Sequence, residues 1–111
     1  MGIVFYTNFL VPKTAAGCAR GIFILIRPQY KDDIGLLAHE RVHVKQYVRS
    51  FGLSGILYKL SKKHRYKYEL EAFKRQVAVS GSHTADHLAS RLAENYGLDI
   101  TKEQALEAIL G

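Results

Sequence analysis

The stretch His39-Glu40-Arg41-Val42-His43 lies within a strongly helical part of the sequence and contains two histidines four positions apart. Residues at this spacing share one face of an α-helix, one turn apart, so both imidazoles can point toward a single ion. Glu40 projects beside that face, where its carboxylate can take a proton from a water that the ion activates. The pattern predicts a metal site with a neighbouring base, and the alternative is an exposed helix with two ordinary histidines.

The residues that flank this motif predict a helix with one face in a hydrophobic core. Asp32 and Asp33 can cap its start and favour it by their charge, and Gly52 can end it after about Phe51. The predicted core residues recur at steps of three and four: Ile34, Leu37, Val44, Val48 and Phe51. A neighbouring stripe consists of Leu36, His39, His43 and Tyr47, which places the motif at the edge of the buried face. Gln46 lies one turn after His43, where it can contact a ligand or a substrate or simply be solvated.

Two apolar segments before the motif predict strands. Residues 3–11 are rich in β-branched and aromatic types and end at Pro12, and residues 21–27 form an almost continuous apolar run that ends at Pro28. A run without alternation indicates a strand that is covered on both faces or lies against helices. Residues 13–20 show no periodicity and are predicted to form a loop, so the two strands can pair as a small sheet.

The part of the chain after the motif predicts a second long helix. Residues 53–60 allow one or two helical turns, residues 61–65 form a basic connection, and the helix is expected from about Tyr66 to Ser80. Its predicted core residues are Leu70, Phe73 and Val77, and Gly81 stops it.

Two shorter helices are expected at the C-terminal end. Ser82 or Thr84 can cap the first, and Thr101 with Gln104 forms a capping box for the second. The predicted core residues are Ala85, Leu88, Ala89 and Leu92 in the first and Ala105, Leu106, Ile109 and Leu110 in the second. The fold class is therefore α+β, with a small N-terminal sheet before the helices, in one domain over residues 1–111.

A catalytic zinc ion usually takes three protein ligands and keeps its fourth position for water, so a third ligand must follow the motif. Glu69 is the best candidate, because Ala72 and Phe73 share its face of the second long helix and the small alanine permits close packing. Glu71 lies about 200° away around the helix, so only one of the two carboxylates can be the ligand. Glu69 is preferred, and an ordinary amphipathic helix with solvated glutamates is the alternative.

The remaining histidines are His64, His83 and His87. His83 and His87 are also four positions apart, with Asp86 beside them, so they could form a second metal site. No glutamate follows His83 as in the motif, and a surface helix with two histidines is the simpler interpretation.

The arrangement resembles the gluzincin branch of the HExxH zinc metallopeptidases, in which a glutamate on a later helix, commonly in a Glu-x-x-Ala pattern, is the third ligand. Here Glu69-Leu70-Glu71-Ala72 matches that pattern. The form His-Glu-x-x-His-x-x-Gln, which includes Gln46, is similar to small metallopeptidases of bacteria and their phages. The resemblance covers the motif helix and the glutamate helix, and this chain departs from full gluzincins in lacking the length for their further domains.

The resemblance implies a minimal zincin-like domain, an enzyme that hydrolyses peptide bonds in a peptide or protein substrate. His39, His43 and Glu69 would bind Zn²⁺, and Glu40 would act as the base. No motif assigns the donor to the oxyanion; Tyr66, one turn before Glu69, is our first choice, and the alternatives are Tyr68, His64 and Arg65. The strand over residues 21–27 could offer an edge to which an extended substrate adds.

The composition of the chain bears on its location and on its possible partners. No apolar stretch reaches the roughly 20 residues of a membrane span, and no signal-peptide pattern begins the chain, so we expect no membrane partner. Cys18 is the only cysteine, which excludes an internal disulfide and a cysteine-based zinc cluster and favours a cytoplasmic location. The net charge of +6, with basic residues concentrated between Lys59 and Arg75, is typical of a solvated surface or of a nucleic-acid partner.

Two other functions stay open. A zinc ion could fasten two helices together without catalysis, although structural zinc sites prefer cysteine ligands and four closed positions. The basic chain could instead be a nucleic-acid-associated module, such as a protease that acts on DNA-bound proteins.

Overall fold

A small mixed sheet begins the fold in the computed structural model, which describes residues 2–111. Its strands are β1 (Ile3–Tyr6), β2 (Gly17–Arg20) and β3 (Phe23–Ile26), in the order β1-β3-β2. β1 runs parallel to β3, and β2 runs antiparallel to it. The predicted pairing of the two apolar segments is therefore confirmed, and β3 lies in the centre of the sheet.

The strand boundaries differ from the prediction in two places. β1 ends at Tyr6 rather than at residue 11, and the predicted loop over residues 13–20 contains β2. β2 and β3 form a tight hairpin whose two turn residues begin with Gly21, at φ 62°. Glycine is favoured at that position because the hairpin turn requires a positive φ. Gly21 was therefore the feature of the sequence from which the hairpin, and with it β2, could have been predicted.

Five α-helices follow the sheet over residues 2–111: α1 (Ile34–Arg49), α2 (Leu53–Leu60), α3 (Lys62–Ser80), α4 (Ala85–Glu94) and α5 (Lys102–Leu110). Short 3₁₀ turns precede α1 (Pro28–Tyr30) and α4 (Ser82–Thr84). Asp33 caps α1 by accepting a hydrogen bond from the Leu36 amide, and Thr101 forms the predicted capping box with Gln104. None of these helices is long and apolar enough to cross a membrane.

α3 begins four residues earlier than expected. The side chain of Ser61 accepts a hydrogen bond from the His64 amide and caps the helix, so the predicted connection over residues 61–65 is largely its first turn. A Ser-x-x-His pattern is a weaker capping signal in sequence than Thr-x-x-Gln, which explains the difference.

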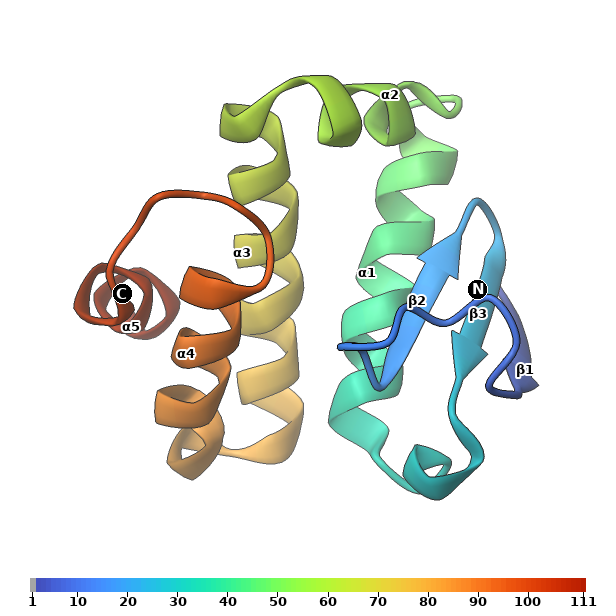
Figure 1. Cartoon of the computed structure of the whole chain (residues 1–111), viewed down its shortest axis with the longest axis horizontal. Helices are drawn as coiled ribbons and strands as arrows, with labels where there is room; N and C mark the ends of the chain where they lie inside the picture. Colours follow the sequence, from blue (N-terminus) through green and yellow to red (C-terminus); the bar gives the residue numbers. More distant parts are fainter. Residues whose placement is uncertain (1) are drawn as a thin grey trace.

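Figure 1 shows how the layers stack: the sheet covers one side of α1, α3 lies along the other side, and α4 and α5 cover the far side of α3. α2 crosses one end of the α1–α3 pair. The observed fold is thus an α+β arrangement with two long central helices. The site predicted from the sequence falls on their shared interface.

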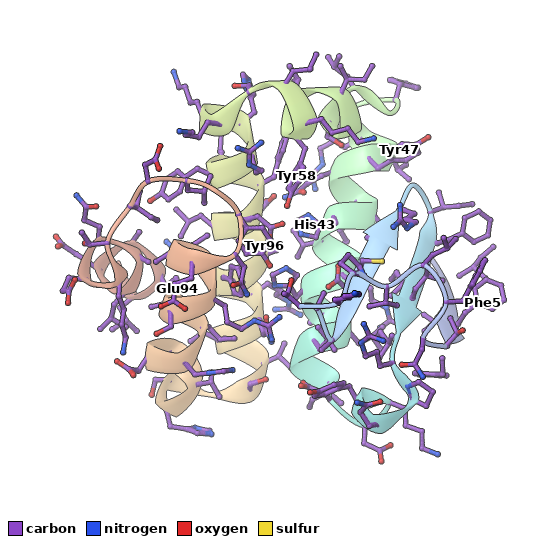
Figure 2. The ribbon with its side chains drawn as sticks, in the orientation of Figure 1. Phe5, His43, Tyr47, Tyr58, Glu94 and Tyr96 are labelled. Atoms are coloured by element: carbon purple, nitrogen blue, oxygen red, sulfur yellow. The ribbon has the colours of Figure 1, made fainter. Side chains whose placement is uncertain are left out.

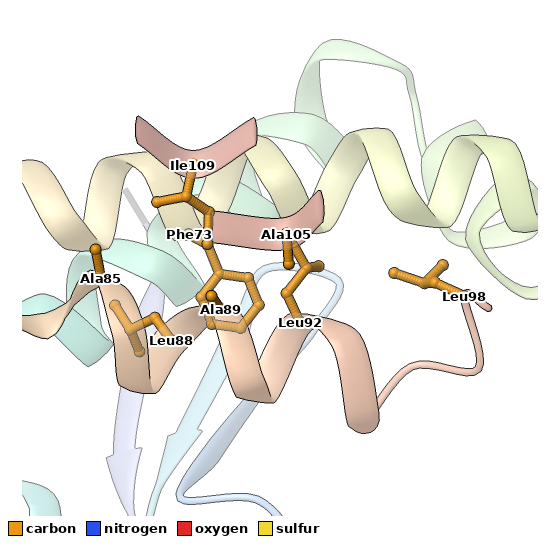
Figure 3. Close-up of a cluster of buried hydrophobic side chains, with 8 residues drawn as sticks. All are labelled: Phe73, Ala85, Leu88, Ala89, Leu92, Leu98, Ala105 and Ile109. Carbon is orange, nitrogen blue, oxygen red and sulfur yellow. The ribbon is translucent and has the colours of Figure 1, made fainter. Parts of the chain in front are cut away.

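Two separate hydrophobic clusters hold these layers together. The first lies between the sheet and α1 and consists of Ala16, Ile24, Ile26, Leu36 and Val44. The second, shown in Figure 3, joins α3 to α4 and α5 and consists of Phe73, Ala85, Leu88, Ala89, Leu92, Leu98, Ala105 and Ile109. The predicted core residues of α4 fall in this cluster, as do Ala105 and Ile109 of α5, whereas Leu110 is exposed.

The predicted core stripe of α1 was wrong in part. Val44 is fully buried, but Ile34, Val48 and Phe51 are 66%, 42% and 99% exposed. α1 instead turns its other side inward, because it packs against α3 as well as against the sheet. Its buried residues are Gly35, Leu36, His39, Glu40, Val44 and Gln46.

Small residues let α1 and α3 approach closely. A Cβ atom added at Gly35 would lie 1.8 Å from the Ser80 hydroxyl oxygen and 3.1 Å from the Ser80 Cβ. Ala72, which was predicted to permit close packing, is fully buried on α3. The polar motif residues are consequently enclosed between two helices.

Candidate metal centre

Three side chains converge between α1 and α3. The Nε2 atoms of His39 and His43 each lie 3.1 Å from Oε1 of Glu69. The possible ligand atoms of these three residues all lie within 4.8 Å of one another, the only such group of three or more in residues 2–111. His39 and Glu69 are almost fully buried and His43 is partly buried. The preference for Glu69 over Glu71 agrees with this geometry, because Glu71 takes a different place.

Gln46 determines which nitrogen of His43 carries hydrogen. Its amide nitrogen donates to the Tyr68 carbonyl oxygen at 3.0 Å and to Oε1 of Glu71 at 2.6 Å, and both partners are acceptors. The amide oxygen therefore faces His43, whose Nδ1 lies 2.9 Å away and must be the donor. In the neutral ring, Nε2 then presents a lone pair toward the Glu69 carboxylate.

Two acceptors that face each other at 3.1 Å repel unless a cation lies between or beside them. A metal ion or a proton on His43 supplies that positive charge. Two imidazole nitrogens and one carboxylate oxygen are ligands that zinc accepts, and neighbouring ligands of tetrahedral zinc are about 3.3 Å apart for bonds of about 2.0 Å. The three residues therefore fit a metal ion of this kind.

His39 has an equivalent support from α3. Its Nδ1 lies 2.9 Å from the amide oxygen of Gln76, a buried residue. The hydrogen bond holds the ring with Nε2 directed toward Glu69. The sequence analysis did not single out Gln76, although it lies seven residues after Glu69 and so on the same helical face.

The second oxygen of Glu69 is held by a residue that the sequence analysis also missed. The Tyr58 hydroxyl, from α2, donates to Oε2 of Glu69 at 2.5 Å. Figure 2 shows Tyr58 directed from α2 toward His43 in the space between α1 and α3. Burial and the Glu69 charge raise the pKa of Tyr58, so the phenol stays protonated and remains a donor. Nothing in the sequence around Tyr58 indicates this contact.

The charges in this cluster shift one another's protonation. Burial alone would lower the pKa of His43, but the Glu69 carboxylate beside it raises that pKa to about 9. Burial opposes the charge of Glu69, yet the two histidines hold its pKa well below the usual range. Without a metal ion, the cluster is thus a buried ion pair between His43 and Glu69.

Glu40 lies next to this cluster in a cleft of about 580 Å³. The cleft is bordered by β2, α1, α2 and α3 and by Tyr96, which follows α4. Within residues 2–111 the Glu40 carboxylate forms no hydrogen bond to another residue, although it is only 5% exposed. Burial raises the pKa of Glu40, as expected for a group that must accept a proton near neutral pH.

Tyr66 does not lie at this site. Its side chain packs against the hydrophobic cluster between α3, α4 and α5 and does not border the cleft, so the predicted role as an oxyanion donor does not fit. Each residue turns an α-helix by about 100°, so Tyr66, three residues before Glu69, lies about 60° away from it around the helix. This offset directs Tyr66 toward α4 and α5. His64 lies in the first turn of α3, where its ring bonds to the hydroxyl of the capping residue Ser61, and it is also outside the cleft.

Arg65 has a structural role instead of a catalytic one. Its guanidinium donates to the backbone carbonyl oxygens of Tyr58 and Tyr96, at 3.0 and 2.9 Å. It therefore fixes the two chain segments that carry these tyrosines to the start of α3. Tyr68 borders the cleft, and its carbonyl oxygen receives the Gln46 amide.

His83 and His87 form no comparable cluster. Both are exposed, and Asp86 pairs with Lys102 at 2.9 Å on the surface. Over residues 2–111, only the cluster of His39, His43 and Glu69 gathers enough ligands for a metal ion.

Comparison of the chain with protein-family models, with curated proteins and with solved structures finds no match.

Proposed function

We propose that the protein is a zinc-dependent peptide hydrolase with a gluzincin-like ligand set and a minimal zincin-like fold. One observation carries the proposal: the possible ligand atoms of three residues lie within 4.8 Å of one another beside the buried Glu40, and all four residues border one cleft. A purely structural site would be closed by a fourth protein ligand. The cleft is large enough for part of an extended peptide.

His39, His43 and Glu69 would hold the ion, and Gln46, Gln76 and Tyr58 keep these ligands oriented. When bound, zinc lowers the pKa of water toward neutrality and polarises a carbonyl group. The carboxylate of Glu40 takes the proton from the attacking water and passes it to the leaving amine. Burial raises the pKa of Glu40 and so makes its carboxylate a better proton acceptor.

The edge of β2 is the best place for an extended substrate. β3 was predicted to offer this edge, but it is hydrogen-bonded on both sides and cannot add another strand. β2 pairs with β3 on one side only, and all four of its residues border the cleft. A peptide that adds to β2 would extend the sheet across the cleft beside Glu40.

Tyr96 is the best donor to the oxyanion of the transition state. It is one of the two tyrosines labelled beside His43 in Figure 2, and it borders the cleft. The hydroxyl of Tyr58 is already engaged with Glu69, whereas that of Tyr96 donates to no other residue of the chain from Gly2 onward. Burial and the charges of Glu69 and Glu40 raise the pKa of Tyr96, which keeps its proton available.

The test combines metal analysis with a peptide-cleavage assay on the full chain. The purified protein should contain about one zinc ion per chain and cleave members of a random peptide library, with products identified by mass spectrometry. Glu40→Gln should keep the zinc and lose activity by at least about 10²–10⁴-fold, because only the base is removed. Retained activity in Glu40→Gln would exclude Glu40 as the base, and an absence of zinc would exclude the proposal.

A conservative pair of variants tests the oxyanion donor. Tyr96→Phe should lower kcat about 10²-fold or more while zinc content and KM change little. Tyr66→Phe is the matched control, because Tyr66 loses the same hydroxyl outside the cleft and should keep full activity. Equal losses in both variants would show that Tyr96 does not act on the reaction.

A further inference from the structure

One end of the molecule combines exposed apolar side chains with basic ones. We define the α2 surface by four apolar residues of the α1–α2 turn and of α2, namely Phe51, Leu53, Ile56 and Leu60, which are 99%, 51%, 56% and 82% exposed. The exposed basic residues around them are Arg49, Lys59, Lys62 and Lys63. In Figure 1, α2 lies across the top of the molecule, at one end of the α1–α3 pair.

The sequence of α2 separates an inner face from an outer one. At about 100° per residue, Leu53, Ile56 and Leu60 fall within about 60° of one another around the helix. Ser54 is buried on the opposite side, and Tyr58 also points inward, toward Glu69. The apolar residues are therefore not part of either hydrophobic cluster, and the helix presents its apolar face to the outside.

Phe51 is held in this exposed place by its backbone. Its φ of 53° lies in the left-handed region, which a bulky residue rarely adopts. Hydrogen bonds fix the turn on both sides: the amide of Phe51 donates to the Val48 carbonyl oxygen, and that of Gly52 donates to the Tyr47 carbonyl oxygen at 2.8 Å. These two bonds make Phe51 the left-handed C′ residue of a Schellman cap that ends α1, and this cap holds the phenyl ring almost fully exposed.

All charged residues in the stretch of sequence that forms this surface are basic. Between residues 41 and 68 the sequence contains eight lysines and arginines and no aspartate or glutamate. Of these, Arg65 is engaged by the fold through its bonds to Tyr58 and Tyr96, and Lys62 forms a surface ion pair with Asp99. A partner for this surface must consequently be anionic as well as apolar.

We propose that the α2 surface docks onto an anionic lipid bilayer, with α2 lying in the plane of the interface. Such helices insert apolar side chains below the headgroups and place lysines and arginines beside the lipid phosphates. Nucleic acid would pair with the lysines, and its bases could stack on Phe51, but it offers no apolar interior for the aliphatic side chains of Leu53, Ile56 and Leu60. A second copy of the chain would bring together two surfaces of the same positive charge. The sequence analysis expected no membrane partner because no segment is long and apolar enough to span a bilayer, but docking at the interface needs no spanning segment.

Docking through the α2 surface would fix the orientation of the cleft relative to the bilayer. Ile56 and Lys59 belong to the α2 surface and also border the cleft, since α2 forms one wall of it. A bilayer in contact with α2 would therefore lie close to the cleft mouth. The inference itself does not depend on zinc or on catalysis, and a protein without either property can still be tested for it.

The experiment is co-sedimentation of the full chain with vesicles at about 0.15 M salt. Vesicles of phosphatidylcholine with phosphatidylserine should bind the protein, and vesicles of phosphatidylcholine alone should bind it far less. Phe51→Ser should weaken partitioning about tenfold or more, because a buried phenyl group is replaced by a polar one. Lys59→Gln and Lys63→Gln should each weaken it about fivefold, and added salt should have the same effect. All three residues are exposed, so the fold should be kept.

Phe9→Ser is the matched control, because Phe9 is 72% exposed and belongs to the segment that follows β1 rather than to the α2 surface. Equal loss in Phe9→Ser and Phe51→Ser would overturn the assignment of the surface. The chain contains no tryptophan, so Phe51→Trp adds a single reporter whose emission should shift to shorter wavelength with anionic vesicles. An unshifted emission, binding to duplex DNA that does not depend on Phe51, or self-association lost in Phe51→Ser without vesicle binding would each overturn the proposal.

Discussion

The glutamine at position 46 shows how single residues prepare this site. Its amide joins His43 to the carboxylate of Glu71 and thereby fixes which imidazole nitrogen faces Glu69. The sequence analysis placed Gln46 on the correct side of the helix but left its role open, since a solvated glutamine looks the same in sequence. Glu71 was considered only as a competing ligand. Helical spacing predicts the face on which a residue lies, but partners on other elements decide its role.

The two glutamates of α3 should respond differently to substitution. Glu69→Ala should abolish stable zinc binding, because a direct ligand is removed. Glu71→Ala should keep the zinc but weaken its affinity about 10–100-fold, because the Gln46 amide loses the acceptor that orients it. Zinc competition with a chromophoric chelator measures both affinities. Unchanged affinity in Glu69→Ala would move the third ligand elsewhere.

The pKa of His43 predicts a pH dependence for the metal-free protein. The pKa is about 9 in the fold and 6.5 as the ordinary value, so folding raises it. The stabilisation by the imidazolium is therefore complete below pH 6.5 and is lost as the pH rises through 9. The free energy of unfolding should fall by about 3 kcal/mol at most over this range. Urea denaturation in the presence of a chelator measures it.

The matched variants for this pH dependence are His43→Asn and His64→Asn. His43→Asn should remove most of the slope above pH 6.5, whereas His64→Asn should keep it, because His64 contacts Ser61 and no carboxylate. A slope that persists in His43→Asn would show that another group titrates. Zinc affinity of the unmodified protein should rise over the same range, since zinc and the proton compete for the ring.

At the scale of elements, the α1–α3 interface decides the geometry of the site. Capping residues and glycines predicted most helices, and the apolar runs predicted two of the three strands. The buried side of α1 was harder to predict, because α1 packs against both the sheet and α3 and its interior face carries glycine and polar residues. Apolar periodicity alone pointed to Ile34, Val48 and Phe51, which are exposed.

Adding bulk at Gly35 should separate the two helices. Gly35→Leu should lower the free energy of unfolding by about 1–3 kcal/mol, because its side chain would overlap Ser80. Zinc affinity should fall as well, since His39 and Glu69 move apart. Gly55→Leu is the control: a Cβ there meets nothing within 4 Å, so stability should stay the same or rise slightly. Thermal and urea denaturation with zinc titration measure both effects.

For the whole molecule, the sequence predicted an α+β fold in which a helix pair follows a small sheet, and it predicted the three side chains that converge on that pair and could hold a metal ion. The cleft was not predictable, because its walls come from β2, from α2 and from Tyr96, which are far apart in the chain. The contacts that bring Tyr58 and Tyr96 to the site run through Arg65 and the backbone. No local sequence pattern predicts these bonds between Arg65 and the two backbone carbonyl oxygens.

Chelation of the metal should destabilise the fold without abolishing it. The two hydrophobic clusters do not include the ligands, so each can persist in the metal-free protein. Zinc at about 1,000 times its Kd should add about 4 kcal/mol to the free energy of unfolding, which corresponds to a Tm increase of roughly 15–30 °C for a chain of this size. Differential scanning calorimetry with and without a chelator measures the shift. Complete unfolding by the chelator would indicate a structural zinc site.

The division of the core into two clusters has a consequence for how the molecule responds to change. His39 and His43 lie on α1, which packs on the sheet through the first hydrophobic cluster. Glu69 lies on α3, which packs on α4 and α5 through the second cluster. Any metal ion bound by all three residues ties the halves together, so its binding free energy is also free energy of their association. If a core substitution in either half shifts α1 or α3, the metal affinity should therefore fall. The metal content of a variant therefore reports whether the two halves of the molecule still pack in their native arrangement.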